Sequence, residues 1–229
     1  AETQQRKLQT ILDVLPVVPP RFDNFVTGGN GETVSRLLGV APGQSIYLWG
    51  EHGSGKTHLL RAATRQHGLY LNTATDILPD PGEPIAPGSI IAVDDVQNLS
   101  EAQAGALFGL FNQWKTSQHT PDAFTLLASG PCAPRQLEIR EDLRTRLAWD
   151  LVYRLETLTD DERRSALLQR ASDKGIPLSA EVTNWMFNYY ARDMSALSSL
   201  LDALDRYSLA EKRSITVPLL KSYLQSRHS

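Results

Sequence analysis

The sequence predicts an α/β fold, a doubly wound sheet of five parallel strands that is followed by a small all-helical subdomain. Short apolar segments alternate with helical patterns as far as Thr157, and strands that alternate with helices indicate a parallel sheet covered on both faces. Beyond Thr157 only helical periodicity remains. We therefore expect three parts: an N-terminal tail over residues 1–20, an α/β domain over residues 21–157 and a helical subdomain over residues 158–229.

Short apolar segments bounded by turn residues are predicted to be the strands, at residues 45–49, 69–71, 90–93, 124–128 and 151–155. Apolar residues at helical spacing predict helices within this domain over residues 32–39, 56–67 and 101–115. Gly39 and Gly68 are expected to stop the first two of these helices. The helical subdomain should contain helices over residues 160–173, 180–190, 195–209 and 217–225. Thr159 and Glu162 offer a capping box at the start of the first.

The composition excludes several classes of protein. The 229 residues include 23 Lys and Arg against 26 Asp and Glu, a net charge of −3, so a globally basic surface for nucleic acid is absent. The single cysteine, Cys132, excludes an internal disulfide framework and is typical of a reducing compartment. No apolar run approaches the ~20 residues of a membrane helix, and the N-terminus lacks the pattern of a secretion signal. We therefore expect a soluble, cytoplasmic protein with no membrane partner.

The segment 50–57 has the glycine spacing of a phosphate-binding P-loop. It lies between a predicted strand and a predicted helix, the context that distinguishes such a loop from a chance match in an ordinary glycine turn. Glycines leave backbone N–H groups free to converge on an anion, and the helix adds its positive N-terminal dipole. Lys56 is expected to reach the β- and γ-phosphates, and the Thr57 hydroxyl to ligate Mg²⁺. The predicted loop comprises Gly50, Glu51, His52, Gly53, Ser54, Gly55, Lys56 and Thr57.

Polar residues end the two strands that are expected beside this loop. Asp94 and Asp95 close the third predicted strand. An acid in this position can hold Mg²⁺ through water, which we assign to Asp94, while Asp95 could orient or deprotonate an attacking water. Ser129 at the end of the fourth strand could touch the γ-phosphate or the attacking water, although Ser-Gly-Pro is also ordinary turn chemistry.

A pair of arginines precedes the fifth predicted strand. Residues 144–146 read Arg-Thr-Arg and are predicted to be helical. An arginine here could project out of the subunit and stabilise the charge of phosphoryl transfer in a neighbour's site. On the residues alone, an arginine that is simply solvated is the commoner outcome.

Four segments together resemble the AAA+ module of the bacterial replication initiator DnaA. They are Arg21–Val26, Gly53–Leu60, Ile91–Gln97 and Asp142–Trp149, and the resemblance covers about residues 20–225. Among the proteins related to DnaA, the chain is most similar to the Hda family. It ends after the helical subdomain, so we expect the initiator's C-terminal DNA-binding domain to be missing. It also begins with a short tail, and its segment Pro131–Leu137 has the Hda form.

The resemblance implies a P-loop AAA+ module with a helical lid, and it implies ligands and partners. Hda-like proteins bind ADP or ATP with Mg²⁺, favour ADP, dock on the DNA-loaded sliding clamp and stimulate hydrolysis of DnaA-bound ATP. The implied partners are DnaA, the clamp, DNA indirectly through the clamp, and a second copy of the chain. The family's arginine finger falls on Arg146, which would act in trans on DnaA-bound ATP. His58 and Ser195 are further implied nucleotide contacts, and hydrolysis by the chain itself is expected to be weak or absent.

The family docks on the clamp through a short N-terminal peptide of the type Gln-Leu-x-Leu. The matching residues are Gln9, Ile11 and Leu12, with Thr10 in place of the usual apolar residue. An extended peptide of this kind offers its apolar side chains to a pocket while the glutamine amide fixes the register. A tail that merely packs on its own domain is the alternative.

The lid departs from the family pattern at one position. Where the family usually has an arginine that reaches the nucleotide phosphates, this chain has Ser195. Arg192, one helical turn earlier, could substitute for it or could be a surface residue. Loss of that guanidinium removes a charge-assisted contact to phosphate, which favours a stable diphosphate-bound state over hydrolysis.

Two other functions remain open on the sequence. A self-sufficient ATPase motor such as a helicase loader is allowed by Asp94, Asp95 and Arg146, whereas Ser195 argues against it. A small-molecule kinase also uses a P-loop but generally has an arginine-rich lid, and the corresponding stretch, residues 80–88, contains prolines and glycines without arginine. Rapid turnover of ATP by the protein without partners would favour the motor.

Overall fold

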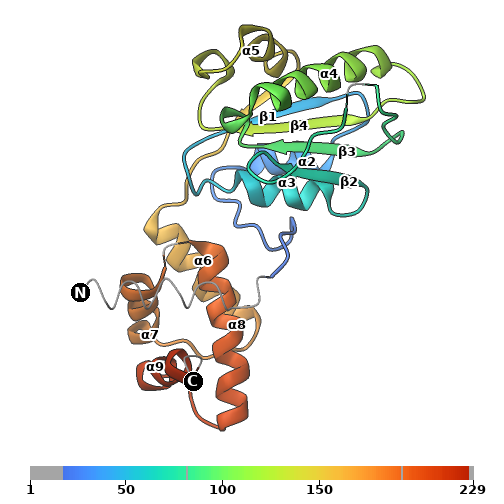
Figure 1. Ribbon diagram of the computed structural model, residues 1–229. Coiled ribbons are helices and arrows are strands. Elements are labelled where there is room, and N and C mark those ends of the chain that lie inside the picture. The colour runs from blue at the N-terminus through green and yellow to red at the C-terminus, as the bar shows by residue number, and fades with distance from the viewer. Residues whose placement is uncertain (1–17, 81, 192, 227–229) are drawn as a thin grey trace. The chain divides into compact units, whose positions relative to one another are not determined.

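The computed structural model describes residues 18–80, 82–191 and 193–226 (Figure 1). They belong to two compact units, one formed by Pro20–Thr157 and the other containing the residues from Leu158 onward. None of the described helices is long and apolar enough to cross a membrane.

The first unit is built on a parallel sheet of five strands in the order β2-β3-β4-β1-β5. The strands are β1 (Ser45–Trp49), β2 (Gly68–Asn72), β3 (Ile90–Asp94), β4 (Thr125–Gly130) and β5 (Leu151–Arg154). The α-helices are α2 (Gly31–Leu38), α3 (Lys56–Thr64), α4 (Glu101–Ser117) and α5 (Glu141–Leu147), and the short 3₁₀ helices are η1 (Val96–Asn98) and η2 (Pro134–Gln136). The predicted fold class, a five-stranded parallel sheet with alternating helices, is confirmed.

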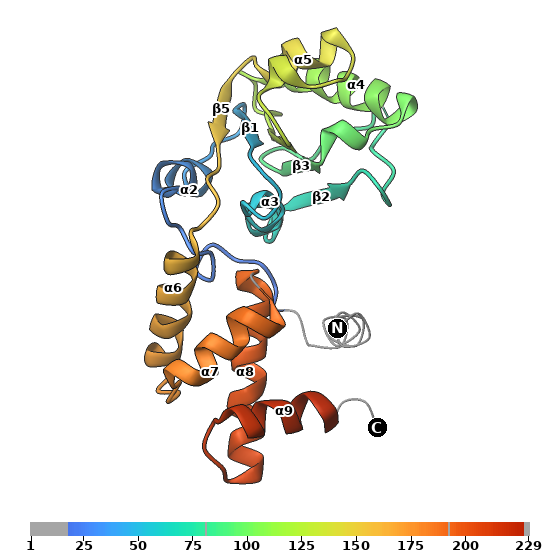
Figure 2. The same ribbon diagram turned by 90° about the vertical axis from the view of Figure 1, so that its left-hand side faces the viewer.

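Helices cover both faces of the sheet. Figure 2 shows α4 and α5 on one side of the sheet and α3 on the other. In β1, Tyr47 packs in the core under α4 and α5, whereas Ile46 and Leu48 pack in the core under α2 and α3. Because both faces of a central strand are buried, its sequence is a continuous apolar run rather than an alternating one.

Several element boundaries differ from the prediction by one to three residues, and those of α3, β2 and β4 bear on the site. The helix predicted over residues 56–67 ends at Thr64, and Gly68 is the first residue of β2 rather than a helix stop. A Cβ atom at Gly68 would lie 2.5 Å from the Ile90 carbonyl oxygen, so glycine is required for the close approach of β2 to β3. In addition, β4 continues to Gly130, so Ser129, predicted at the end of this strand, is its penultimate residue.

The second unit is helical and has its own core. Its helices are α6 (Asp160–Asp173), α7 (Ala180–Trp185), α8 (Met194–Glu211) and α9 (Val217–Ser226). The predicted capping box at α6 is present, since Thr159 and Glu162 each bond to the other's backbone N–H. The helix predicted over residues 180–190 is α7 followed by a π-helical turn, η3 (Met186–Tyr190). The core of the helical unit is formed by fully buried leucines from α6, α8 and α9, among them Leu167, Leu197, Leu200, Leu204 and Leu219.

Candidate functional site

The glycine-rich loop connects the end of β1 to the start of α3. Gly53 and Gly55 have φ angles of +81° and +96°, a left-handed conformation that side chains disfavour. A Cβ atom at Gly50 would lie 2.4 Å from the Leu155 carbonyl oxygen, so this glycine allows the loop to pass close to the chain after β5. The glycine spacing is therefore explained by the backbone path of the loop.

Lys56 is the first residue of α3 and is only 9% exposed. Its Nζ donates hydrogen bonds to the carbonyl oxygens of Gly50 (2.7 Å) and Glu51 (2.9 Å). Burial lowers the pKa of Lys56, and the nearby carboxylates of Asp95 and Asp94 oppose this shift. The side chain thus folds back over the glycine-rich loop and places its ammonium group against the loop's own carbonyl oxygens.

The Asp94 carboxylate is buried at the end of β3 and accepts hydrogen bonds from three hydroxyl groups. The Thr57 Oγ1 and the Tyr70 hydroxyl each lie 2.6 Å from Oδ2, and the Ser129 hydroxyl donates to Oδ1. The structure therefore brings together Thr57, Asp94 and Ser129, which the sequence singled out separately. It adds Tyr70, which sequence reasoning missed.

Asp95 lies at a sharp bend directly after β3, with a left-handed φ of 55° that is uncommon for a residue other than glycine. Its N–H donates to the Ser129 hydroxyl (3.0 Å), and its carbonyl oxygen accepts from Thr73 Oγ1 (3.1 Å). Its carboxylate accepts from Gln97 Nε2 at 3.2 Å. The bend is thus held from both sides, and the half-buried carboxylate lies on the η1 side of it.

Thr57 and Asp94 have the chemistry of a magnesium site. Mg²⁺ prefers oxygen ligands and is usually held by one or two carboxylates together with substrate phosphates. The Thr57 hydroxyl oxygen and an Asp94 carboxylate oxygen are 2.6 Å apart beside the glycine-rich loop. No group of three or more His, Cys, Asp or Glu residues suited to a metal occurs in the part of the chain that the structure describes. The donor set therefore fits an ion shared between protein and phosphate, rather than one held by protein alone.

The segment upstream of α2 lies against the start of α3. The His58 Nε2 is 2.8 Å from the Arg21 carbonyl oxygen, and the ring centroids of His58 and Phe25 are 5.3 Å apart. Because a carbonyl oxygen only accepts, His58 Nε2 carries the proton in this contact. His58, which the resemblance implies as a nucleotide contact, thus lies against Arg21 and Phe25 of the segment upstream of α2.

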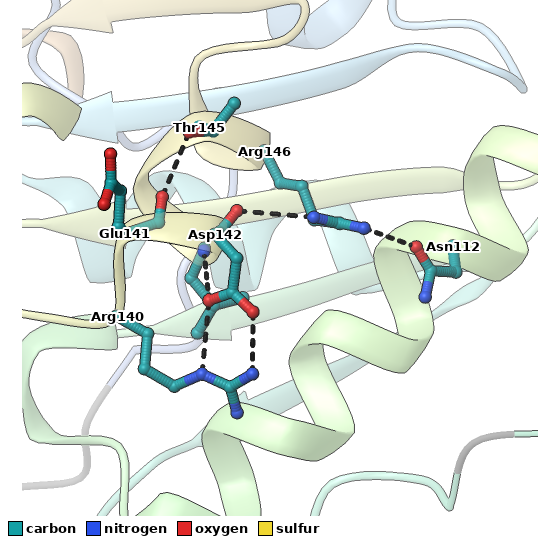
Figure 3. A network of polar contacts seen from close by, with 7 residues as sticks. Asn112, Arg140, Glu141, Asp142, Thr145 and Arg146 are labelled. Atoms are coloured by element: carbon teal, nitrogen blue, oxygen red, sulfur yellow. Dashed lines mark hydrogen bonds and ion pairs between the residues drawn. The ribbon is translucent and has the colours of Figure 1, made fainter.

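Arg146 lies on α5 and is held against α4 rather than freely solvated (Figure 3). Its guanidinium carbon is 3.6 Å from the centroid of the Phe108 ring and 4.8 Å from that of Trp149. Nη2 donates to Asn112 Oδ1 at 2.8 Å, and Nη1 lies 3.5 Å from the Asp142 carbonyl oxygen. The guanidinium plane is therefore fixed by aromatic and polar contacts from two helices, on the face of the sheet opposite α3.

The remaining predicted residues lie elsewhere. Ser195 is the second residue of α8 and is exposed on the helical unit. Arg192 and the proposed clamp peptide, Gln9, Ile11 and Leu12, lie outside the described residues.

Three comparisons relate this chain to known proteins. Residues 160–224 match the family model described as the Hda lid domain. An uncharacterized protein of Haemophilus influenzae is 34% identical over 194 residues, which cover 78% of this chain and 80% of that protein.

Among solved structures, domain III of the Thermotoga maritima replication initiation protein DnaA has a TM-score of 0.61 at 19% identity, and covers 92% of this chain and 98% of its own. AMPPCP-bound DnaA from Aquifex aeolicus has a TM-score of 0.56 at 17% identity, with 82% and 66% covered. A RuvB mutant of Thermotoga maritima has a TM-score of 0.62 at 14% identity, with 91% and 73% covered. The fold is that of the AAA+ module, the segment 160–224 is a lid domain of the Hda type, and the chain is therefore Hda-like.

Proposed function

We propose that this protein regulates replication initiation by binding adenine nucleotide with Mg²⁺, docking on the DNA-loaded sliding clamp and stimulating hydrolysis of DnaA-bound ATP. The observation that carries the proposal is the position of Arg146, which is oriented by α4 and α5 on the side of the sheet away from α3. From that side we expect the arginine to act on a nucleotide held by a neighbouring protein rather than on one held by the loop of its own chain.

The nucleotide-binding step uses the loop between β1 and α3. Backbone N–H groups of the left-handed glycines and the start of α3 would bind the phosphates. Lys56 would exchange its bonds to two loop carbonyls for bonds to phosphate oxygens. Thr57 and Asp94 would hold Mg²⁺, whose charge would offset that of the phosphates. That a solved DnaA of the same fold binds AMPPCP supports this assignment.

The regulatory step uses Arg146. Phosphoryl transfer spreads negative charge over the γ-phosphate oxygens, and an arginine supplied in trans is worth about 10³–10⁵ in rate. Contact with Phe108 and Asn112 restricts the Arg146 side chain before any partner binds, so less conformational entropy is lost on docking. DnaA-bound ATP is the proposed target because the fold is that of DnaA and the lid is that of Hda.

The protein's own hydrolysis is proposed to be weak, with ADP as the favoured nucleotide. Ser195 offers no cation to the phosphates in the position where the family usually has arginine. Asp95 and Ser129 keep their proposed roles near the γ-phosphate, with Ser129 also bridging the backbone of Asp95 to Asp94.

The clamp-docking step rests on the N-terminal peptide at Gln9, Ile11 and Leu12. A net charge of −3 supports DNA contact through the clamp rather than by the chain itself. Binding to clamp on DNA would raise the local concentration of Arg146 near DnaA that is bound to the same DNA.

The test is single-turnover hydrolysis of labelled ATP preloaded on DnaA, with and without this protein and with and without clamp loaded on DNA. We expect hydrolysis to accelerate only when the protein and the loaded clamp are both present. An alternative, a self-sufficient ATPase of the helicase-loader type, is favoured by the intact Thr57–Asp94 pair. Fast turnover of free ATP by the protein alone would support that alternative and contradict the regulator.

A further inference from the structure

We propose that Tyr70 is a positioning residue of the magnesium–nucleotide site, where it fixes the Asp94 carboxylate so that one acceptor position remains for the metal's shell. The inference rests on the proposed nucleotide-binding function and extends it to a residue on the edge strand β2. The observation behind it is the 2.6 Å hydrogen bond from the Tyr70 hydroxyl to Asp94 Oδ2.

The position of Tyr70 follows from the pairing of β2 with β3. Asn72 is paired with Asp94 and Tyr70 with Ala92, so Tyr70 is the diagonal neighbour of Asp94 on the same face of the sheet. A long aromatic side chain can reach across that diagonal. The contact is thus fixed by register, and it persists for as long as these two strands are paired.

The ring of Tyr70 is also held from the other side. The Arg61 guanidinium carbon is 4.0 Å from the centroid of the ring, and Arg61 lies one helical turn after Thr57 on α3. Arg61 therefore stacks on the Tyr70 ring. The hydroxyl of that ring and the hydroxyl of Thr57 both donate to the same oxygen atom, Asp94 Oδ2. This arrangement leaves the tyrosine little freedom to turn its hydroxyl away from Asp94.

The bonds to Asp94 can be counted. An ionised carboxylate has about four acceptor positions, two on each oxygen atom. Oδ2 accepts from Thr57 and Tyr70, and Oδ1 accepts from Ser129. Among these described contacts, the one remaining acceptor position is on Oδ1. Tyr70 therefore fills Oδ2, prevents rotation of the carboxylate and directs the vacant position of Asp94 to one oxygen atom.

Tyr70 remains a donor throughout the working range of pH. Burial, together with the hydrogen bond and negative charge of Asp94, raises the pKa of Tyr70 above its ordinary value. The hydroxyl proton is thus retained, and the contact does not depend on a titration near neutrality.

The test separates a metal-specific effect from a general one. Binding of a fluorescent ADP analogue is measured for the whole chain, first in EDTA and then across a titration with Mg²⁺. Tyr70→Phe removes only the hydroxyl and keeps the ring under Arg61. We expect the Mg²⁺ concentration at half-maximal enhancement of binding to rise about tenfold, as for loss of one hydrogen bond to a charged group. ADP affinity in EDTA should stay within about twofold of wild type, since the metal-free contacts to phosphate are unchanged.

Tyr189→Phe is the matched control, because Tyr189 is an exposed tyrosine of the helical unit. It should leave the Mg²⁺ titration unchanged, and thermal melting should show that both variants are folded. An unchanged Mg²⁺ midpoint in Tyr70→Phe, or an equal loss of affinity with and without Mg²⁺, would overturn the positioning role alone. Failure of the wild-type protein to bind the ADP analogue would instead overturn the nucleotide-binding function on which it rests.

Discussion

The Lys56 Nζ donates a 2.7 Å hydrogen bond to the carbonyl oxygen of Gly50, six residues earlier in the same loop. The Lys56 ammonium group is therefore hydrogen-bonded to carbonyl oxygens of its own loop. Binding of a nucleotide would replace these bonds with bonds to phosphate oxygens. A hydrogen bond from an ammonium group to an anionic phosphate is stronger than one to a neutral carbonyl, so the exchange is favourable.

The first prediction concerns this lysine. Lys56→Ala should reduce ADP affinity by about 10- to 100-fold, as expected for loss of contacts between charged groups. Calorimetric titration with ADP measures the change, and circular dichroism serves as the check of folding. A folded variant with wild-type ADP affinity would contradict the P-loop assignment.

The second prediction concerns the left-handed glycines. Gly53→Ala should cost about 1–2 kcal/mol of unfolding free energy, because its φ of +81° is strained for alanine while nothing lies within 4 Å of the added Cβ. Gly55→Ala should cost more, since its Cβ would also lie 2.6 Å from the Phe25 ring. Urea denaturation of both variants measures the difference. An equal loss of unfolding free energy in the two variants would show that the Phe25 ring can move away from the added Cβ atom at no cost in stability. It would contradict the claim that the segment containing Phe25 is held against the loop.

The third prediction concerns pH and the helical unit. The backbone and side chain of Thr159 hold the pKa of Glu162 below its usual value, so the contribution of the Glu162 charge to stability is present above the ordinary pKa of a glutamate. It is lost as the pH falls through the lowered pKa in the folded state. The melting-temperature deficit of Glu162→Ala should therefore narrow under acid conditions. Glu162→Gln, which can keep the capping box without a titrating group, is the control, and a deficit that does not change with pH would refute the prediction.

The fourth prediction concerns the tail. Gln9→Ala combined with Leu12→Ala should abolish capture of the sliding clamp in a pull-down while ADP affinity stays at the wild-type level. Gln5→Ala with Leu8→Ala has the same spacing in the same tail and should retain capture. Loss of capture in the second pair alone would move the clamp peptide to the earlier register. Capture at wild-type level by the first pair would remove the peptide's proposed role.

The sheet could be predicted because burial of both faces makes each central strand a continuous apolar run, as in Ile46, Tyr47 and Leu48. The end of α3 could not be predicted, because a glycine such as Gly68 can either stop a helix or allow two strands to approach closely. Only the position of Ile90 decides between these roles.

The glycine-rich loop of the candidate site could also be predicted from the sequence. The loop at residues 50–57 is contiguous in sequence, and its spacing is a local signal. Tyr70 was missed because its contact with Asp94 depends on the register of β2 against β3. Asn112 was missed because it reaches Arg146 across two packed helices, and a single amide on a helix gives no sequence signal of such a contact.

The central claim is that Arg146 acts on ATP bound to DnaA, and Arg146→Ala tests it most directly. The measurement is single-turnover hydrolysis of labelled ATP on DnaA, with clamp loaded on DNA. Arg144→Ala, on the same helix, is the matched control, and ADP affinity, clamp capture and melting temperature are measured for each variant. Arg146→Lys should rescue poorly, because it keeps the charge but loses the planar fork.

We predict that Arg146→Ala abolishes the stimulation of DnaA while its ADP affinity and clamp capture remain intact, and that Arg144→Ala still stimulates. An arginine finger contributes about 10³–10⁵ in rate, so the loss should be unmistakable. Equal stimulation by Arg146→Ala and wild type would contradict the account, as would loss of ADP binding in a folded Arg146→Ala variant.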